Sequence, residues 1–486
     1  MSLTRYKLGE ILDVTRGASL SGEFYATEGE YIRLTCGNFD YQNNCFKENK
    51  SKDNLYYIGE FKPEFLMEKG DIITPLTEQA IGLLGSTAMI PESGKYIQSQ
   101  DVAKIVCKEG LLDKDFAFYL ISSALVKQQL SAAAQQTKIR HTSPDKIKDC
   151  TVWIPDLVEQ KHIGKLLRSL DRKIELNRAI NQNLEAMAKQ LYDYWFVQFD
   201  FPDEEGKPYK SSGGAMVWNE KLKRNIPIGW NNGTLIDIAN ITMGQSPDGT
   251  SYNEIGEGVF FYQGSTDFGM RFPSVRQYTT APSRFAKKGD ILMSVRAPVG
   301  AVNIANNDCC IGRGLSALNS KIGSTTHLYY ILNDLRIAFD QRNAAGTTFG
   351  SITKEDLYSL PIVIPAKEVI SAFDKICSPM FDRQMLLGEE IDTLIKQRDE
   401  LLPLLMNDQV SVNSDLTTFL QLLFRQYTIR VYTWAYSHKI KTITMMKYNF
   451  IRTRLVKIVC GCCGRNFYAE AGINFCSECE ETWNNN

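Results

Sequence analysis

The sequence lacks several common catalytic motifs. It contains no Gly-x-x-x-x-Gly-Lys-Ser/Thr loop for a triphosphate and no His-Glu-x-x-His pair for a metal. A Gly-x-Ser-x-Gly nucleophile turn and an Asn-Pro-Pro-aromatic loop for a target amine are also absent. Only four histidines occur, His141, His162, His327 and His438, and none lies near a plausible catalytic partner in the sequence. We therefore predict a chain that catalyses no reaction itself.

Long apolar runs are missing as well. No stretch approaches the roughly 18 uncharged apolar residues that a membrane-spanning helix needs. The first residues, MSLTRYKLGE, have no apolar core of the kind found in signal peptides. These absences predict a cytoplasmic protein with no membrane partner.

The sequence has no surplus of basic residues. It carries 55 Lys or Arg against 56 Asp or Glu, a formal net charge of −1. Proteins that coat DNA without sequence preference are usually strongly basic, because they neutralise many phosphates. Any nucleic-acid role of this chain must therefore rest on local basic patches, on partner subunits, or on both.

Most of the chain also lacks cysteines at metal-like spacing. The scattered ones are Cys36, Cys45, Cys107, Cys150, Cys309, Cys310 and Cys377. In a cytosolic chain such residues are most simply buried or idle thiols. The other five cysteines lie within the last 30 residues, which distinguishes that end from the rest.

What the sequence does contain is an internal repeat. Three segments of the first half recur in the same order in the second half. The pairs are Lys69–Ile73 with Lys288–Leu292, Ser143–Pro155 with Thr353–Pro365, and Leu170–Lys173 with Phe381–Gln384. Their offsets of 219, 210 and 211 residues are nearly constant, which predicts a tandem duplication.

Each copy combines a β-rich part with a helical part. Short apolar runs bounded by turn residues, such as YIRLT and DILMSV, predict strands with a few short helices. We expect an α+β protein made of a β-rich domain (1–156), a spacer helix (157–200), a linker (201–225), a second β-rich domain (226–366), a second spacer helix (367–406) and an atypical tail (407–486).

Both helical parts have a coiled-coil pattern. Apolar residues recur at alternating spacings of four and three over about 30–35 residues, or roughly 50 Å of helix. Asn177, Asn181, Gln384 and Arg398 interrupt the apolar seams, and such polar residues suit register selection better than maximal stability. The two helices could each pack on a separate core. We favour an antiparallel coiled coil between them, because a duplicated unit can close on itself through pseudo-twofold contacts.

This order of parts resembles the specificity subunit of type I restriction-modification enzymes. The local sequences agree: KGDII and KGDIL in the β-rich domains, VWIP and IVIP before the helices, and GGAMVWNEKLKRNIPIGW at the junction. The likeness covers about residues 1–406. It implies two target-recognition domains, each of which contacts one half of a split site in double-stranded DNA.

The resemblance also implies partner proteins. Methylase subunits, one for each half-site, would dock on the helices and modify one adenine in each half. A restriction subunit, which is a translocase and nuclease, would cut DNA in which both adenines are unmodified. Two recognition domains on one rigid spacer reach the same face of the duplex about one helical turn apart, roughly 10 base pairs. Two alternatives stay open: a specificity subunit of a type IIG-like system, and a coiled-coil scaffold that does not bind DNA.

The expected base contacts are arginine with guanine and asparagine or glutamine with adenine. Candidates lie in turn-rich segments near predicted strand ends. They are Arg33, Asn38, Gln79, Gln98 and Gln100 in the first domain, and Gln263, Arg271, Arg276, Arg284, Arg296 and Arg313 in the second. Lys138 and Arg140 suit phosphate better than bases. Because the two domains differ outside the repeat motifs, the two half-sites should differ in sequence.

The tail has a different character from the repeats. Residues 407–486 carry nine Lys or Arg and six Asp or Glu. Cys460-x-x-Cys463 and Cys476-x-x-Cys479 are separated by twelve residues, a spacing that suits zinc held by four thiolates. We predict a small zinc-ribbon-like module with a structural zinc, with incidental thiols as the alternative. We expect no cofactor in the duplicated part.

Overall fold

The computed structural model describes most of the chain up to the end of the second long helix. Described are residues 3–50, 53–78, 82–133, 140–344, 350–407, 409, 456–459 and 466–469. They belong to two compact units, Met1–Gln409 and Val410–Asn486. None of the described helices is both long enough and apolar enough to cross a membrane.

The first β-rich domain is built on two four-stranded sheets with the orders β10-β8-β12-β2 and β11-β4-β7-β3. The strands are β2 (Leu12–Arg16), β3 (Tyr25–Ala26), β4 (Tyr31–Arg33), β7 (Tyr56–Tyr57), β8 (Ile72–Pro75), β10 (Ala88–Met89), β11 (Tyr96–Ile97) and β12 (Val102–Cys107). Every residue of β8 is buried, which explains why exposed polar and buried apolar residues do not alternate along it.

Shorter elements complete this domain. They are β1 (Thr4–Lys7), α1 (Leu8–Ile11), β5 (Phe39–Asp40), β6 (Cys45–Phe46), β9 (Thr77–Glu78), α2 (Lys114–Ile121), α3 (Ala124–Ala133), β13 (Arg140–His141), α4 (Pro144–Lys148) and β14 (Thr151–Ile154). Strand β1 pairs antiparallel with β14, so the domain closes where the first long helix begins.

The second β-rich domain repeats this plan. Its sheets have the orders β18-β26-β23-β24 and β19-β21-β20-β25-β22, and β17 pairs with β27 as β1 pairs with β14. The elements are β17 (Asn231–Thr234), α6 (Leu235–Ile238), β18 (Ala239–Met243), β19 (Tyr252–Asn253), β20 (Val259–Tyr262), β21 (Gln277–Thr279), β22 (Phe285–Ala286), β23 (Ile291–Ser294), β24 (Val302–Ile304), β25 (Cys309–Ile311), β26 (Leu315–Ser320), α7 (Thr325–Ala344), α8 (Lys354–Tyr358) and β27 (Pro361–Ile364).

The two domains also share individual backbone hydrogen bonds. Written from donor N to acceptor O, the matched pairs are Gly70 to Ile90 and Gly289 to Ala305, both 2.8 Å, and Thr142 to Leu76 and Ile352 to Val295, both 2.9 Å. The repeated KGDI segments therefore enter the same turn and the same sheet position in both domains.

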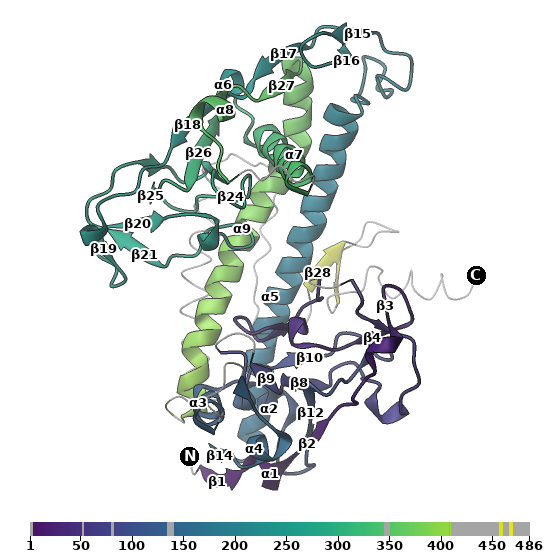
Figure 1. Ribbon diagram of the computed structural model, residues 1–486, viewed down its shortest axis with the longest axis vertical. Helices are drawn as coiled ribbons and strands as arrows, with labels where there is room; N and C mark the ends of the chain where they lie inside the picture. The colour runs from purple at the N-terminus through teal and green to yellow at the C-terminus, as the bar shows by residue number, and fades with distance from the viewer. Residues whose placement is uncertain are drawn as a thin grey trace. The chain divides into compact units, whose positions relative to one another are not determined.

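Two long helices follow the β-rich domains. Helix α5 (Leu157–Tyr192) is capped by Asp156, whose carboxylate accepts the backbone N–H groups of Val158 and Glu159 at 3.0 Å. It continues into a π-helical turn (Asp193–Val197), and α9 (Lys367–Met406) is the equivalent helix of the second copy. Figure 1 shows α5 and α9 side by side within the first unit.

Polar contacts give the relative direction of α5 and α9. Arg398 pairs with Asp171 at 3.0 Å, Glu390 approaches Lys173 at 3.5 Å, and Gln384 donates to the Asn181 carbonyl at 3.2 Å. The numbers rise in one helix as they fall in the other, so the helices run antiparallel. The polar seam residues Asn177, Asn181, Gln384 and Arg398 are all buried. Regular knobs-into-holes packing along this pair stays a prediction.

The linker after α5 begins as part of a core. Phe199 and Phe201 are 3% and 6% exposed, and the Phe201 ring stacks on Trp230 with ring centres 5.0 Å apart. The Pro, Gly, Ser and charge content of residues 201–225 predicts a surface linker. Phe201 is the buried residue of this segment, and the residues from 202 to 225 are exposed or half-buried, in keeping with that expectation. The linker then forms a hairpin of β15 (Met216–Asn219) and β16 (Arg224–Pro227).

Candidate nucleic-acid interface

A four-residue turn precedes an interior strand of the main sheet in both domains. We call Ser99–Val102 the first-domain turn and Gly312–Leu315 the second-domain turn. Each closes with a hydrogen bond from its fourth to its first residue, at 3.1 Å and 3.0 Å respectively. The adjoining backbone bonds match as well: Ala18 N donates to Gln98 O and Gln245 N donates to Ile311 O, both at 3.0 Å.

The second-domain turn gathers exposed polar side chains from five segments. Backbone hydrogen bonds connect these segments: Gln245 to Ile311 at 3.0 Å, Ile311 to Arg284 at 2.9 Å, Gly312 to Tyr262 at 2.9 Å, and Val295 to Gly314 at 2.9 Å. The side chains are Gln245, Gln263, Arg284, Arg296 and Arg313, all exposed. Among the described residues, no hydrogen bond or ion pair engages their amide or guanidinium groups. The cluster therefore offers three available guanidinium groups and two available amides.

Gln245 was not among the candidates taken from the sequence. It follows Gly244, which occupies the place of Gly17 in the first copy. A Cβ atom at Gly244 would lie 2.1 Å from the Gly312 carbonyl oxygen, so the strand end packs directly against the turn. Alignment of T-R-G with T-M-G in the two copies would have pointed to this position.

The first-domain turn carries a different set of groups. Gln100 is its exposed second residue, and Arg16 donates Nε to the Gln100 backbone carbonyl at 2.8 Å. Nearby, His141 Nδ1 lies 3.3 Å from the Thr77 hydroxyl. Thr77 holds the place that Arg296 holds in the second domain, because each follows the β-strand of the repeated KGDI segment. The first-domain turn thus combines an amide, an arginine and an imidazole.

Three other candidates of the first domain are buried and bonded internally. The Arg33 guanidinium donates to the Asn54 carbonyl at 3.2 Å. The Gln98 amide donates to two backbone carbonyls at 2.8 and 3.0 Å. The Asn38 amide oxygen accepts the Thr35 N–H at 2.9 Å. The protein itself therefore already satisfies these polar groups, which support the fold.

Two arginines of the second domain are also engaged. Arg271 is 8% exposed, lies 3.2 Å from the Glu185 carboxylate of α5, and has its guanidinium 4.4 Å from the ring centre of Phe381 in α9. It therefore attaches the second domain to both long helices. Arg276 is more exposed, but its Nε donates to the buried carboxylate of Asp267 at 2.9 Å.

Six of the predicted site residues lie outside the described residues: Gln79, Lys138, Cys460, Cys463, Cys476 and Cys479. Only the backbone of Arg140, in β13, is described, where it pairs with Glu78. No group of three or more His, Cys, Asp or Glu suited to a metal occurs in the described part of the chain.

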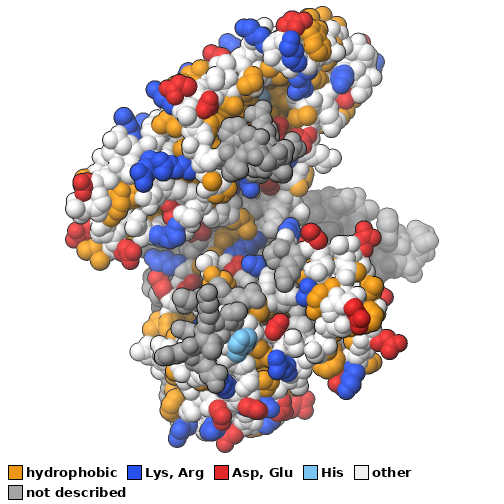
Figure 2. Space-filling view, viewed as in Figure 1, with side chains coloured by type: hydrophobic (Ala, Val, Ile, Leu, Met, Phe, Trp, Pro, Cys, Tyr) orange, Lys and Arg blue, Asp and Glu red, His pale blue; other side chains and the backbone are white. Residues whose placement is uncertain are grey.

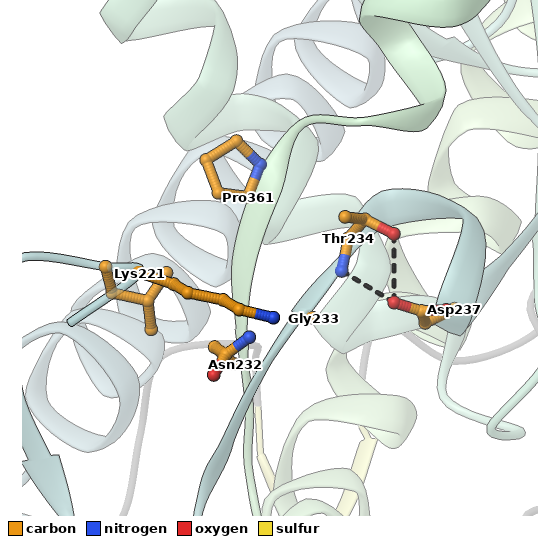
Figure 3. Close-up of a pocket in the computed structure, with 7 residues that line it drawn as sticks. Lys221, Asn232, Gly233, Thr234, Asp237 and Pro361 are labelled. Atoms are coloured by element: carbon orange, nitrogen blue, oxygen red, sulfur yellow. Dashed lines mark hydrogen bonds between the residues drawn. The ribbon is translucent and has the colours of Figure 1, made fainter. Parts of the chain in front are cut away.

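One hollow of the surface lies beside α6 and is lined by residues of the hairpin, of α6 and of the strands next to it. Its volume is about 260 Å³. Figure 3 shows Lys221 and Asn232 among the residues that line it. Its Asp237 accepts the N–H and hydroxyl of Thr234 at 2.7 and 2.9 Å, and these bonds lower the pKa of the carboxyl group. The carboxylate therefore caps a helix. Figure 2 shows basic and acidic side chains interspersed on the visible face, in keeping with the balanced charge.

Comparisons with known proteins give a consistent result. A family model described as the type I restriction modification DNA specificity domain matches residues 3–186 and 227–382, so each match spans one β-rich domain and part or most of its helix. The putative type I restriction enzyme MjaX specificity subunit of Methanocaldococcus jannaschii is 32% identical over 289 residues, which are 58% of this chain. The match spans 64% of that relative, less than two thirds of its length.

Two further proteins agree with this result. The type I restriction enzyme MjaIX specificity subunit of the same organism is 24% identical over 330 residues, covering 65% of this chain and 73% of the relative. Among solved structures, the S subunit of a type I restriction-modification system from M. genitalium has a similar fold, with a TM-score of 0.54 and 17% identity. It covers 83% of this chain and 96% of its own.

Proposed function

Because this chain belongs to the family of type I restriction-modification DNA specificity domains, we propose that it is the specificity subunit of a type I restriction-modification complex. It recognises a split DNA site and catalyses no reaction itself. One observation carries the proposal beyond family membership. Equivalent exposed turns occur in both domains, and they present different hydrogen-bonding side chains on the same backbone frame.

The two turns suit DNA recognition in the major groove. Arginine matches the acceptor pair of guanine, and glutamine matches the donor and acceptor of adenine. Each domain is attached to both long helices, the first through Asp171 and Arg398 and the second through Arg271. Helices of 36 and 40 residues are about 54 and 60 Å long. The site should therefore have two unlike specific blocks and a spacer of fixed length and free sequence.

The balanced charge of the chain points to partners. With a net charge of −1, the subunit offers little general attraction to phosphates. We propose that methylase subunits, one for each half-site, bind the long helices and supply much of that attraction as well as the chemistry. Restriction subunits with translocase and nuclease activity join this assembly. The pairing of α5 with α9 as a coiled coil would then set the distance between the half-sites.

The decisive experiment is co-expression with the neighbouring methylase subunit, followed by mapping of modified adenines by single-molecule sequencing. The expected result is a split motif with one modified adenine in each block, on opposite strands. Assembly without sequence-specific modification would favour the scaffold alternative. Absence of any complex would contradict the proposed docking of a methylase on the helices. Modification by a single partner chain that also cuts DNA would favour the type IIG-like alternative.

The tail supports a separate proposal, a structural zinc held by Cys460, Cys463, Cys476 and Cys479. Two described strands, β28 (Val456–Val459) and β29 (Asn466–Ala469), pair antiparallel, with Val459 opposite Asn466. The first Cys-x-x-Cys pair falls in the six residues between them, as in a zinc-binding hairpin. The thiolates would hold the metal as a fold-stabilising ion with no catalytic part.

A further inference from the structure

The second residues of the two turns, Gln100 and Arg313, are equivalent positions. Each follows the residue whose carbonyl oxygen accepts the hydrogen bond that closes the turn. Each also lies two residues before a strand, β12 or β26, that pairs with the strand of the repeated KGDI segment, β8 or β23. The glycines that pack against the two turns, Gly17 and Gly244, are equivalent as well. A Cβ atom at Gly17 would lie 2.4 Å from the Ser99 oxygen, and one at Gly244 would lie 2.1 Å from the Gly312 oxygen.

The backbone beneath these side chains is closely packed. In the second domain, a Cβ atom on Gly314 would lie 2.5 Å from the Gln263 carbonyl oxygen. The Arg313 N–H donates to the Ser246 hydroxyl at 3.2 Å, and the Gly314 carbonyl accepts from Val295 at 2.9 Å. The turn cannot shift without breaking these contacts. It therefore holds the base of the Arg313 side chain in one place, as sequence-specific recognition requires.

The side chains themselves are available for a ligand. Gln100 and Arg313 are exposed, and across the described ranges no hydrogen bond or ion pair engages their polar ends. Arg276 provides the contrast, because Asp267 already engages its guanidinium. Exposed arginines often bind phosphate without base preference. For this pair, however, an arginine and a glutamine occupy the same place in two domains that contact unlike half-sites.

We infer that Arg313 contacts a guanine in the half-site of the second domain, and that Gln100 contacts an adenine in the half-site of the first. This inference rests on the proposed function. The chemistry is specific, because a guanidinium can donate two hydrogen bonds to guanine O6 and N7. A carboxamide can donate to adenine N7 and accept from its N6 amino group. Exchange of the two residue types should therefore change the preference at a single base of each half-site.

The test uses the full chain with its methylase partner and compares the modified motif of the wild type with those of Arg313→Gln and Gln100→Arg. In Arg313→Gln, the preference for guanine should fall about tenfold or more at one position of one block. The other block should be unchanged. Gln100→Arg should produce the reciprocal loss of an adenine preference in the other block. The matched control, Arg276→Gln, should leave both blocks unchanged.

Each outcome has a definite meaning. An unchanged motif in both exchanged variants would overturn the inference while the wild-type motif still supports the proposed function. The inference would also be overturned if Arg313→Gln lowered modification equally at all sequences while Arg313→Lys kept it at the wild-type level. That pattern indicates phosphate binding. Co-purification of each variant with the methylase subunit separates these outcomes from misfolding. If the wild type gives no motif, the proposed function fails first.

Discussion

The buried ion pair between Arg398 and Asp171 should contribute strongly to stability. Arg398 is 6% exposed, and its Nη1 lies 3.0 Å from Asp171 Oδ1 and 3.3 Å from the Asn43 carbonyl. The Tyr119 hydroxyl donates to the other carboxylate oxygen. The group thus joins α9, α5 and the first β-rich domain.

The expected magnitude follows from burial. Replacement of Asp171 by Leu would leave the Arg398 charge in the interior with only the more exposed Asp399 beside it, at 2.8 Å. Loss of one partner of a buried pair typically costs about 3–5 kcal/mol, because the remaining charge is uncompensated. The double variant Arg398→Met, Asp171→Leu removes both charges and should recover much of this loss. We therefore expect a coupling free energy of about 2 kcal/mol or more.

The assay is a double-mutant cycle on the free energy of unfolding in urea, with folding checked by circular dichroism. The matched control is the exposed pair of Lys396 and Glu400 on the same helix, 3.9 Å apart and 77% and 61% exposed. Its loss should change stability by about 0.5 kcal/mol at most. If the single substitutions at Arg398 and Asp171 cost under about 1 kcal/mol each, or simply add in the double variant, the proposed coupling of the helices through this pair is refuted.

Three further predictions concern a buried histidine, a glycine and the tail. Burial lowers the pKa of His327 from 6.5 to about 4, so the stability that its neutral form contributes is lost as pH falls from about 6.5 toward 4. The substitution His327→Phe introduces the residue type found at the equivalent position of the first domain, Phe116, and should reduce this acid loss by up to about 3 kcal/mol. Urea unfolding at pH 7 and 4.5 measures the difference. An unchanged dependence of stability on pH would contradict the lowered pKa of His327. Gly244→Ala should destabilise the second domain by about 1–3 kcal/mol and weaken recognition of one block only. The control Gly249→Ala, whose added Cβ atom would have no neighbour within 4 Å, should have neither effect. The purified chain should contain one zinc by mass spectrometry, and Cys476→Ser should lose it; full zinc retention would exclude four-thiolate binding.

The sequence alone was sufficient for the elements that depend on local patterns. The heptad spacing predicted helices over 157–200 and 367–406, and the structure has α5 and α9 there, because a periodic apolar stripe determines a helix wherever it packs. Three ordered repeats predicted two similar domains, and the matched hydrogen bonds of the KGDI segments follow from that duplication. The family followed from the same order of motifs, and the matched ranges agree with it.

The sequence could not decide which polar side chains face outward. Gln98 and Gln100 are two residues apart in similar surroundings, yet the first is 1% exposed and the second is exposed. The difference arises because strand β2, more than eighty residues away in sequence, brings the Thr15 carbonyl within 2.8 Å of the Gln98 amide. In the same way, Arg271 is buried because α5 and α9 supply Glu185 and an aromatic ring. Local sequence determines what a side chain can bond to, but only the tertiary structure determines whether the protein already satisfies that bond or leaves it for a ligand.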